Sequence, residues 1–255
     1  MWKPDGTKIA FVPGCFEIYV INADGTEQMK LANGWSPTWS PDGKRIAFQG
    51  CLSEYECDFY AREEPIIYVM NSDGSSKSRI ADGWYPTWSP DGKRIAYVAK
   101  GGVYAMNPDG TGKALLTTIE NDRVYDLAWS PDGRAIIFEQ GRDIYIVNSI
   151  GTNKMRITEG SSPAWSPDGR RIAFESEDGL CVINRDGSNR TLLTKFCCWA
   201  GVVWSADGNQ IAFNREEITD FGLMEIWAIG VDGKNLRRIT TSAFGDCYFP
   251  AWSPR

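Results

Sequence analysis

A ten-residue motif recurs along the chain and constrains its fold more than any other feature. Its clearest copy is Trp39-Ser40-Pro41-Asp42-Gly43-Lys44-Arg45-Ile46-Ala47-Phe48, and a near-identical copy runs from Trp88 to Tyr97. The other full, shortened or partial copies begin at Trp2, Trp129, Trp165, Trp204 and Trp252. Successive Trp residues of the motif lie 36 to 49 residues apart. A repeat of about 40 residues with several short strands is typical of a β-propeller with one blade per repeat, so the six intervals predict six blades.

Each repeat divides into four short strands, which we call A to D in chain order. Strand A ends at the Trp, a Ser-Pro-Asp-Gly turn leads into strand B, and an Asn-x-Asp-Gly turn joins strands C and D. These residue types suit type I turns in which Gly takes a positive φ. We therefore expect an all-β, six-bladed propeller with four antiparallel strands per blade. In one domain spanning residues 1–255, the expected blades are 2–38, 39–87, 88–128, 129–164, 165–203 and 204–248, with residues 249–255 as a closing strand beside residues 7–12.

Proline and charge predict the order of the strands within a blade. Proline has no N–H to donate to a ladder and is confined to edges, and it lies in strand A at Pro37, Pro86, Pro163 and Pro250. Strand A is therefore the inner edge. Charged residues on an outer edge discourage pairing with other chains, and strand D carries them at Lys30, Arg79, Lys113, Arg156, Arg190 and Arg237.

Composition excludes several classes of function. The chain has no His, which removes Ser-His-Asp catalysis and the usual general base near neutral pH. Its net charge is −6 with no basic run, so we expect no nucleic-acid partner. Apolar stretches are strand-sized, so we expect no membrane insertion. We therefore expect no enzyme and no cofactor. We also expect no metal ligands, because the Asp-Gly turns lack the spacing of a calcium loop.

Variable loops indicate which face of the propeller binds. The regular A–B and C–D turns emerge on one face, and the B–C and D–A loops emerge on the opposite face, which we call the irregular face. Its long loops span residues 50–65, 117–126, 195–201, 215–224 and 241–249. Variable loops on a rigid frame are where binding usually lies.

Aromatic residues are the main candidates for partner contact on the irregular face. They and one acid lie just ahead of strand A: Trp35, Trp84, Tyr85, Tyr125, Asp126, Trp199, Tyr248 and Phe249. Trp and Tyr offer flat, half-polar surfaces that suit partner side chains or sugar faces. The alternative is that these rings plug the mouth of the channel as core.

Acidic residues crowd two loops of the same face. They are Glu54, Glu56, Asp58, Glu63 and Glu64 in one loop, and Glu216, Glu217 and Asp220 in the other. The pattern is typical of solvated loops, and the alternatives are a site for a basic partner or a calcium ion.

Six of the seven cysteines also fall in loops of the irregular face: Cys15, Cys51, Cys57, Cys197, Cys198 and Cys247. This placement predicts at least one disulfide and an oxidising compartment. Cys51 and Cys57 are the nearest candidate pair, and the sequence does not choose among the connectivities. Cys181 falls at the buried aromatic position of strand C, where we expect a free thiol.

The motif, followed by a segment such as Ile18–Gly25, resembles the WD40-like propeller repeat of the TolB type over essentially the whole chain. TolB-type propellers belong to the periplasmic Tol–Pal system, so the resemblance implies a protein partner and a periplasmic or extracellular location, with the leader absent from this chain. Similar repeats occur beside the hydrolase domain of prolyl-oligopeptidase-type enzymes and in oligogalacturonate lyases. This chain has neither a Gly-x-Ser-x-Gly elbow nor a His to ligate the lyase metal.

We therefore expect a non-catalytic binding or scaffold propeller that engages a protein through the irregular face, alone or as a subunit of a larger assembly. One alternative is a carbohydrate-binding propeller. Another is a glycan-active enzyme that works with two carboxyl groups, for which Asp126 and Asp246 are the candidates.

Overall fold

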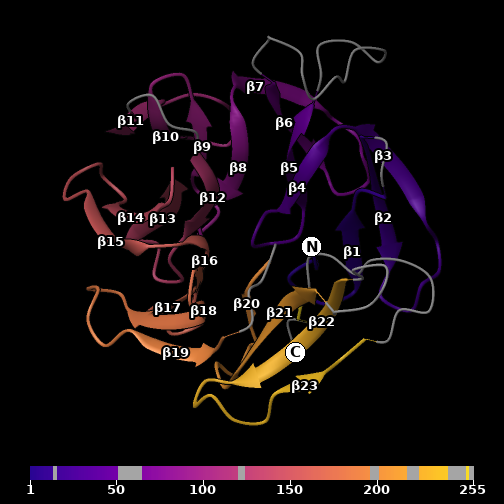
Figure 1. Cartoon of the computed structure of the whole chain (residues 1–255). Coiled ribbons are helices and arrows are strands. Elements are labelled where there is room, and N and C mark those ends of the chain that lie inside the picture. The colour runs from indigo at the N-terminus through magenta and orange to yellow at the C-terminus, as the bar shows by residue number, and fades with distance from the viewer. Residues whose placement is uncertain are drawn as a thin grey trace.

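The computed structural model describes residues 1–13, 16–50, 65–119, 124–195, 201–216, 224–240 and 251–252. These ranges contain strands β1 to β23 and no helix, and accordingly none that is long and apolar enough to cross a membrane. The strands form six antiparallel sheets, which are arranged as blades around a common centre (Figure 1). The expected fold class, an all-β propeller of six four-stranded blades, is confirmed.

The first three blades hold β1 to β11. They are β1 (Lys8–Phe11), β2 (Glu17–Asn22) and β3 (Met29–Asn33); β4 (Trp35–Trp39), β5 (Arg45–Gly50), β6 (Ile66–Asn71) and β7 (Ser78–Asp82); and β8 (Trp84–Trp88), β9 (Ile95–Ala99), β10 (Gly102–Met106) and β11 (Ala114–Thr118).

The last three blades hold β12 to β23. They are β12 (Val124–Trp129), β13 (Ala135–Gln140), β14 (Asp143–Asn148) and β15 (Met155–Glu159); β16 (Ser161–Trp165), β17 (Arg171–Ser176), β18 (Gly179–Asn184) and β19 (Thr191–Thr194); and β20 (Val203–Trp204), β21 (Gln210–Glu216), β22 (Met224–Gly230) and β23 (Arg237–Arg238).

Strand order within the blades follows the prediction from proline. The second blade runs β4-β5-β6-β7, and the third to sixth blades keep the same A-B-C-D order. The proline-containing strands β4, β8 and β16 lie nearest the middle of the ring, together with β12 and β20, which contain no proline (Figure 1). Each of these inner strands contacts the next one around the ring, so residues at their starts can meet across blade boundaries.

The N-terminal residues hold the innermost position of the first blade. Trp2 forms an antiparallel bridge with Ile9, and the Ala10 N–H donates to the carbonyl oxygen of Met1 at 2.9 Å. The other edge of β1 pairs with β2. In the described part of the chain, Met1 and Trp2 thus lie along this edge at Ile9 and Ala10. Residues 249, 250 and 253–255 lie outside the described residues, so the expected closing strand beside residues 7–12 stays a prediction.

Tryptophan indoles link each inner strand to the one before it. Trp88 Nε1 donates to the carbonyl oxygen of Thr38 at 3.2 Å, and Trp252 Nε1 donates to that of Val203 at 3.3 Å. Equivalent bonds are made by Trp39, Trp129, Trp165 and Trp204. The Trp residues of the first and last copies therefore have separate places: Trp2 bridges to the first blade, and Trp252 continues the series on the sixth.

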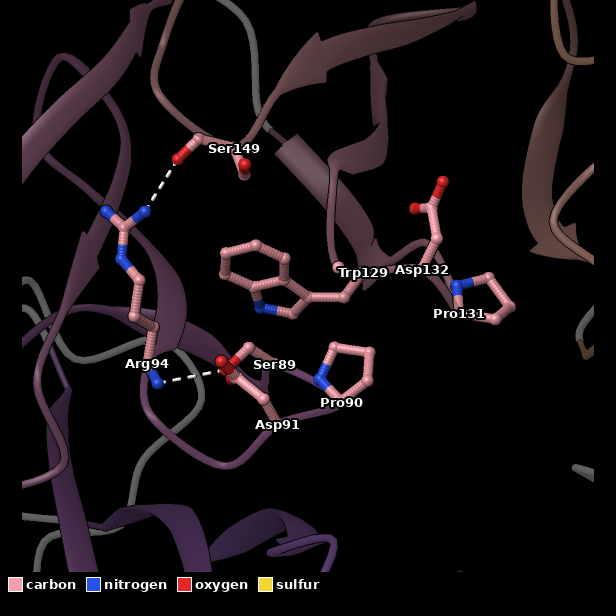
Figure 2. A pocket seen from close by; sticks show the side chains of 9 residues that line it. Ser89, Pro90, Asp91, Arg94, Trp129, Pro131, Asp132 and Ser149 are labelled. Carbon is pink, nitrogen blue, oxygen red and sulfur yellow. Dashed lines mark hydrogen bonds between the residues drawn. The ribbon is translucent and has the colours of Figure 1, made fainter.

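Turn chemistry explains the recurrent Ser-Pro-Asp-Gly sequence. The Ser89 hydroxyl oxygen accepts from the Arg94 N–H at 2.9 Å (Figure 2). Asp91 Oδ1 accepts from the Lys93 N–H at 3.0 Å and from the Ser89 hydroxyl at 2.6 Å, and these bonds, the hydroxyl first, lower the pKa of Asp91. Gly92 takes a φ of 68°, which side chains resist. The same hydroxyl-to-carboxylate bond recurs at Ser40, Ser130, Ser166 and Ser205.

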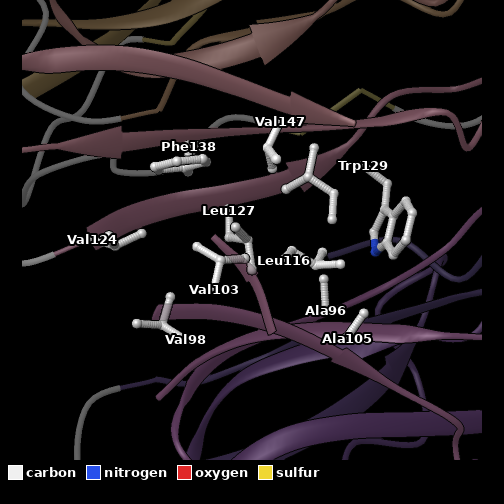
Figure 3. Packing of buried hydrophobic residues seen from close by; sticks show 11 residues of the cluster. Ala96, Val98, Val103, Ala105, Leu116, Val124, Leu127, Trp129, Phe138 and Val147 are labelled. Atoms are coloured by element: carbon white, nitrogen blue, oxygen red, sulfur yellow. The ribbon is translucent and has the colours of Figure 1, made fainter. Parts of the chain in front are cut away.

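Apolar side chains fill the space between neighbouring blades. Between the third and fourth blades, Val103 and Leu116 lie with Trp129 and Phe138 in one buried cluster (Figure 3). Strand B supplies one buried aromatic residue to each of five blades, at Phe48, Tyr97, Phe138, Phe174 and Phe213, all at most 3% exposed. Because a single blade cannot bury both of its faces, this packing ties the blades into one ring.

The structure tests the prediction for one cysteine, Cys181, and leaves the predictions for the other six untested. Cys181 in β18 is a free thiol with 1% exposure, which confirms its expected role as a small apolar residue. Cys15, Cys51, Cys57, Cys197, Cys198 and Cys247 lie outside the described residues, and their disulfides stay a prediction.

Candidate functional site

Five of the predicted contact residues lie at the starts of three inner strands. Trp35 begins β4, Trp84 and Tyr85 begin β8, and Tyr125 and Asp126 belong to β12. The strands therefore extend further toward the irregular face than the sequence suggested, and these residues sit on the rigid sheet rather than in loops. Trp199, Tyr248, Phe249 and the alternative acid Asp246 lie outside the described residues.

A β-bulge shapes this end of the inner strands. The pairing register with strand B shifts between Trp35 and Thr38, between Trp84 and Thr87, and between Tyr125 and Ala128. The residue three before the motif Trp takes a positive φ of 50° to 52° at Ser36, Tyr85, Asp126 and Ser162. A bulge sets two residues against one and re-aims their side chains, so consecutive residues such as Trp84 and Tyr85 both come to this surface.

Tyr85 is the unusual residue at the bulge position. The equivalent residues are Ser36, Asp126, Ser162 and Gly201, all of which tolerate a left-handed backbone better than an aromatic residue does. A bulky residue in this region costs on the order of 1–3 kcal/mol. The Tyr85 N–H donates to Gln49 Oε1 of the preceding blade at 3.0 Å, which helps to hold the conformation.

The aromatic rings are half-buried. Trp84 and Tyr85 pack against the buried cluster of Figure 3, and the ring of Tyr85 meets that of Tyr125 at 6.1 Å with an interplanar angle of 61°. Trp35 makes a similar edge contact with Phe16 at 5.5 Å. Each ring therefore has an anchored side and an accessible part. A bound partner would cover this accessible part. If the rings instead plug the mouth of the channel, other core side chains would cover it.

Three carboxyl groups gather beside these rings, around the start of β16. Glu139 Oε2 in β13 accepts from the Ser162 N–H at 3.1 Å, and Glu175 Oε2 in β17 accepts from the Ser161 hydroxyl at 3.5 Å. Asp126 in β12 accepts from the Ser162 hydroxyl. Residues from two blades are thus brought together by the closeness of their inner strands.

Enclosure by protein raises the pKa of all three acids. Burial is the first cause for Glu175, followed by the negative charge of Asp126, and its pKa is raised to about 8. Burial and then Asp126 also raise the pKa of Glu139. Asp126 keeps solvent contact on β12, yet protein surrounds enough of the carboxyl group to raise its pKa. Glu175 Oε1 is buried without a hydrogen-bond partner among the described residues.

The sequence analysis missed Glu139 and Glu175. Both follow the buried aromatic residue of strand B, in a position that holds Gln49, Val98 and Asn214 in other blades. A charged residue there, inside an otherwise apolar central strand, was the available signal. Across the described residues, no group of three His, Cys, Asp or Glu side chains is arranged to hold a metal ion.

Comparison with known proteins places the chain among propellers of one type. A family model described as the TolB beta propeller domain matches residues 1–159, and no curated protein matches in sequence. TolB from Acinetobacter baumannii superposes with a TM-score of 0.70 at 20% identity, over 97% of this chain and 66% of that one. The chain therefore spans slightly less than two thirds of that protein.

Two further solved structures are similar. A putative TolB from Agrobacterium tumefaciens gives a TM-score of 0.65 at 22% identity, over 93% of this chain and 94% of that one. An oligogalacturonate lyase from Vibrio parahaemolyticus gives 0.71 at 13% identity, over 92% and 77%. At these identities the structural likeness shows the shared fold alone, because one propeller frame hosts unrelated activities.

Proposed function

The chain belongs to the TolB beta propeller domain family, and from this premise we propose that it is a non-catalytic propeller that binds a protein partner. The binding surface is the bulged start of β4, β8 and β12. The observation that carries the proposal is the left-handed φ of 52° at Tyr85. Backbone strain of this kind tends to be kept at functional sites, and the other blades show that the fold accepts small or polar residues there.

Half-buried aromatic residues support a contact role. Hot spots of protein interfaces are enriched in Trp and Tyr that are anchored on one side and covered by the partner on the other. Trp84, Tyr85 and Tyr125 meet this description, since two of them rest on the inter-blade core and the third packs against Tyr85. Their placement on paired strands keeps the surface rigid before the partner arrives.

Location and assembly form part of the proposal. The TolB-type repeats and the six loop cysteines favour the periplasm or the extracellular space. There the propeller would act as an interaction module or as a subunit of a larger assembly.

A second candidate function rests on the acids. Glu175, with its pKa raised to about 8, is protonated at neutral pH and lies near two other carboxyl groups. A protonated acid beside an ionisable carboxyl group is the arrangement by which many glycosidases cleave sugars, and the neighbouring Tyr rings offer sugar-stacking surfaces. In this alternative Glu175 donates the proton and Asp126 or Glu139 supplies the carboxylate.

One pair of experiments separates the two functions. Immobilised protein is incubated with an envelope extract of the source organism, and retained proteins are quantified by mass spectrometry for wild type, Trp84→Ala and Glu175→Gln. The protein-binding proposal expects a specific protein lost with Trp84→Ala and kept with Glu175→Gln. Release of reducing ends from oligosaccharides by wild type, abolished by Glu175→Gln, would establish the glycan-active alternative instead.

A further inference from the structure

The C–D turn of the fourth blade breaks the pattern of the other turns. In the third blade, Asp109 Oδ1 accepts from the Thr111 N–H at 2.9 Å and from its hydroxyl at 2.6 Å. Asp24, Asp73 and Asp186 make the same pair of bonds. In the fourth blade this position is Ile150, which at 76% is the most exposed large apolar residue of the described part of the chain.

The fold does not require an isoleucine at this position. Asn148 Oδ1 takes over the task of the missing carboxylate, because it accepts from the Thr152 N–H at 2.7 Å and from the Ile150 N–H at 3.3 Å. The exposed Ile150 side chain adds no burial in return. A residue that departs from a local rule without a compensating gain in stability points to function.

A cleft lies beside this turn, between the third and fourth blades (Figure 2). Its volume is about 510 Å³, and Pro90, Trp129 and Pro131 form apolar walls. Arg94 crosses the cleft, donating from Nη1 to the carbonyl oxygen of Ser149 at 2.6 Å. The cleft opens on the regular face, opposite the bulged starts of the inner strands.

The next blade boundary shows how such a cleft is closed. Arg185 holds the turn position that Ser149 holds one blade earlier. Its guanidinium lies 5.2 Å from the centre of the Trp165 ring, and its Nη1 donates to Asp132 Oδ2 at 2.9 Å. The matching residues at the open cleft are Trp129 and Asp91. Ser149 is too short to reach them. Arg94, whose counterpart at the next boundary is Ala135, lies over Trp129 instead, but it bonds to the Ser149 carbonyl oxygen rather than to Asp91.

Charge in the cleft favours a cationic occupant. Asp132 uses both carboxylate oxygens, one with Arg185 and one within its own turn. Asp91 uses only Oδ1, and its lowered pKa keeps it ionised at neutral pH. Arg94 already lies 5.9 Å from the Trp129 ring and is tied to Ser149, which leaves Asp91 Oδ2 as the acceptor for an incoming cation.

We propose that this cleft docks an extended segment of a partner protein, in which an arginine side chain binds Asp91 and a neighbouring apolar side chain covers Ile150. The incoming guanidinium makes with Asp91 the bond that Arg185 makes with Asp132. Arginine suits this site because its planar fork can bond a carboxylate while its stem packs on proline. The site lies on the opposite face from the inner-strand surface, so one propeller can hold two partner segments at once.

A titration with a matched pair of peptides tests the proposal. The probes are acetyl-Gly-Leu-Arg-Gly-amide and the same peptide with citrulline, which keeps the shape of arginine but has no charge. The response is the shift of the Trp indole N–H and Ile methyl signals by NMR. The proposal expects Trp129 and Ile150 to respond, Trp165 to remain unchanged, and the citrulline peptide to bind about tenfold more weakly. Equal binding of both peptides, or no response at Trp129, would overturn it.

Three surface variants complete the test, each checked for an unchanged circular dichroism spectrum. Ser149→Arg fills the cleft in the manner of Arg185 and should abolish the response. Arg185→Ser opens the matching space one blade further on and should add a response at Trp165. Ile150→Asp restores the repeat and should weaken binding several-fold without lowering the thermal midpoint. Wild-type binding by Ser149→Arg, or no gained response with Arg185→Ser, contradicts the docking site.

Discussion

The ring of Tyr85 meets the ring of Tyr125 edge to face at 6.1 Å, and this contact joins the bulged starts of β8 and β12. Tyr85 reaches Tyr125 from a left-handed backbone, which the Gln49 amide helps to hold. The pair is therefore a product of three neighbouring blades rather than of one. Its exposed part is the centre of the proposed contact surface.

Replacing Tyr85 by Ser should separate binding from stability. The change relieves the left-handed strain of an aromatic residue and loses an edge contact worth roughly 1 kcal/mol, so the thermal midpoint should move by only a few degrees. Partner binding should weaken by about 2 kcal/mol or more. Ser162→Ala, at the same bulge position one blade beyond Asp126, is the control that should bind normally. A large loss of stability in Tyr85→Ser would make the ring part of the core.

Removing a ring from the inter-blade packing should have the opposite effect. Phe138 is fully buried and stacks on Tyr145 at 5.7 Å, so Phe138→Ala should lower the free energy of unfolding by about 3–5 kcal/mol. Urea denaturation monitored by Trp fluorescence measures this. The matched surface change Ile150→Ala should stay within about 0.5 kcal/mol of wild type. A similar result for both variants would mean that the blades are not held together by this packing.

The raised pKa of Glu175 predicts that the free energy of unfolding falls as the pH rises. Burial raises its folded-state pKa from 4.5 to about 8, so the folded protein binds more protons than the unfolded chain between these values. The contribution is fully present below about pH 4.5 and is lost as the pH approaches 8. Glu175→Gln should flatten this slope and raise the midpoint at pH 9. Unfolding curves from pH 5 to pH 9 check it, and an unchanged slope in the variant would contradict the enclosed acid.

The pairing of Met1 with the first blade predicts that shortening the N-terminus has a local effect on that blade. Ala10 donates its N–H to the carbonyl oxygen of Met1, so deleting residues 1–3 should speed hydrogen exchange at Ala10 and leave Ala47 in the second blade protected. Native-state exchange followed by NMR reports both amides. If deletion of residues 249–255 exposes Ala10 instead, the C-terminal segment closes the ring after all.

Much of the fold could be predicted because its causes are local. The four residues Ser89–Gly92 determine their own turn through local hydrogen bonds. A Pro in strand A restricts that strand to a sheet edge in whichever blade it occurs. The left-handed Tyr85 could not be predicted, since its conformation depends on Gln49 in another blade. The closeness of Glu139 and Glu175 could not be predicted either, because the two residues belong to different blades. Two similar segments, the motif copies at Trp2 and at Trp252, could lie along the inner edge of the first blade. The spacing of the repeats alone does not decide between them.

The most direct test of the proposed function is photo-crosslinking from the Tyr85 position in the native host. Tyr85→p-benzoylphenylalanine places a reactive aromatic group on the inner-strand surface. The control is the same group at Asp73, in the C–D turn of the second blade and outside the cleft lined by Asp91 and Trp129. The proposal predicts a discrete protein adduct from position 85 that disappears when Trp84 and Tyr125 are also changed to Ala, and no such adduct from position 73. An adduct from position 73 alone, or none from position 85, would contradict the inner-strand surface as the place where this propeller binds its partner.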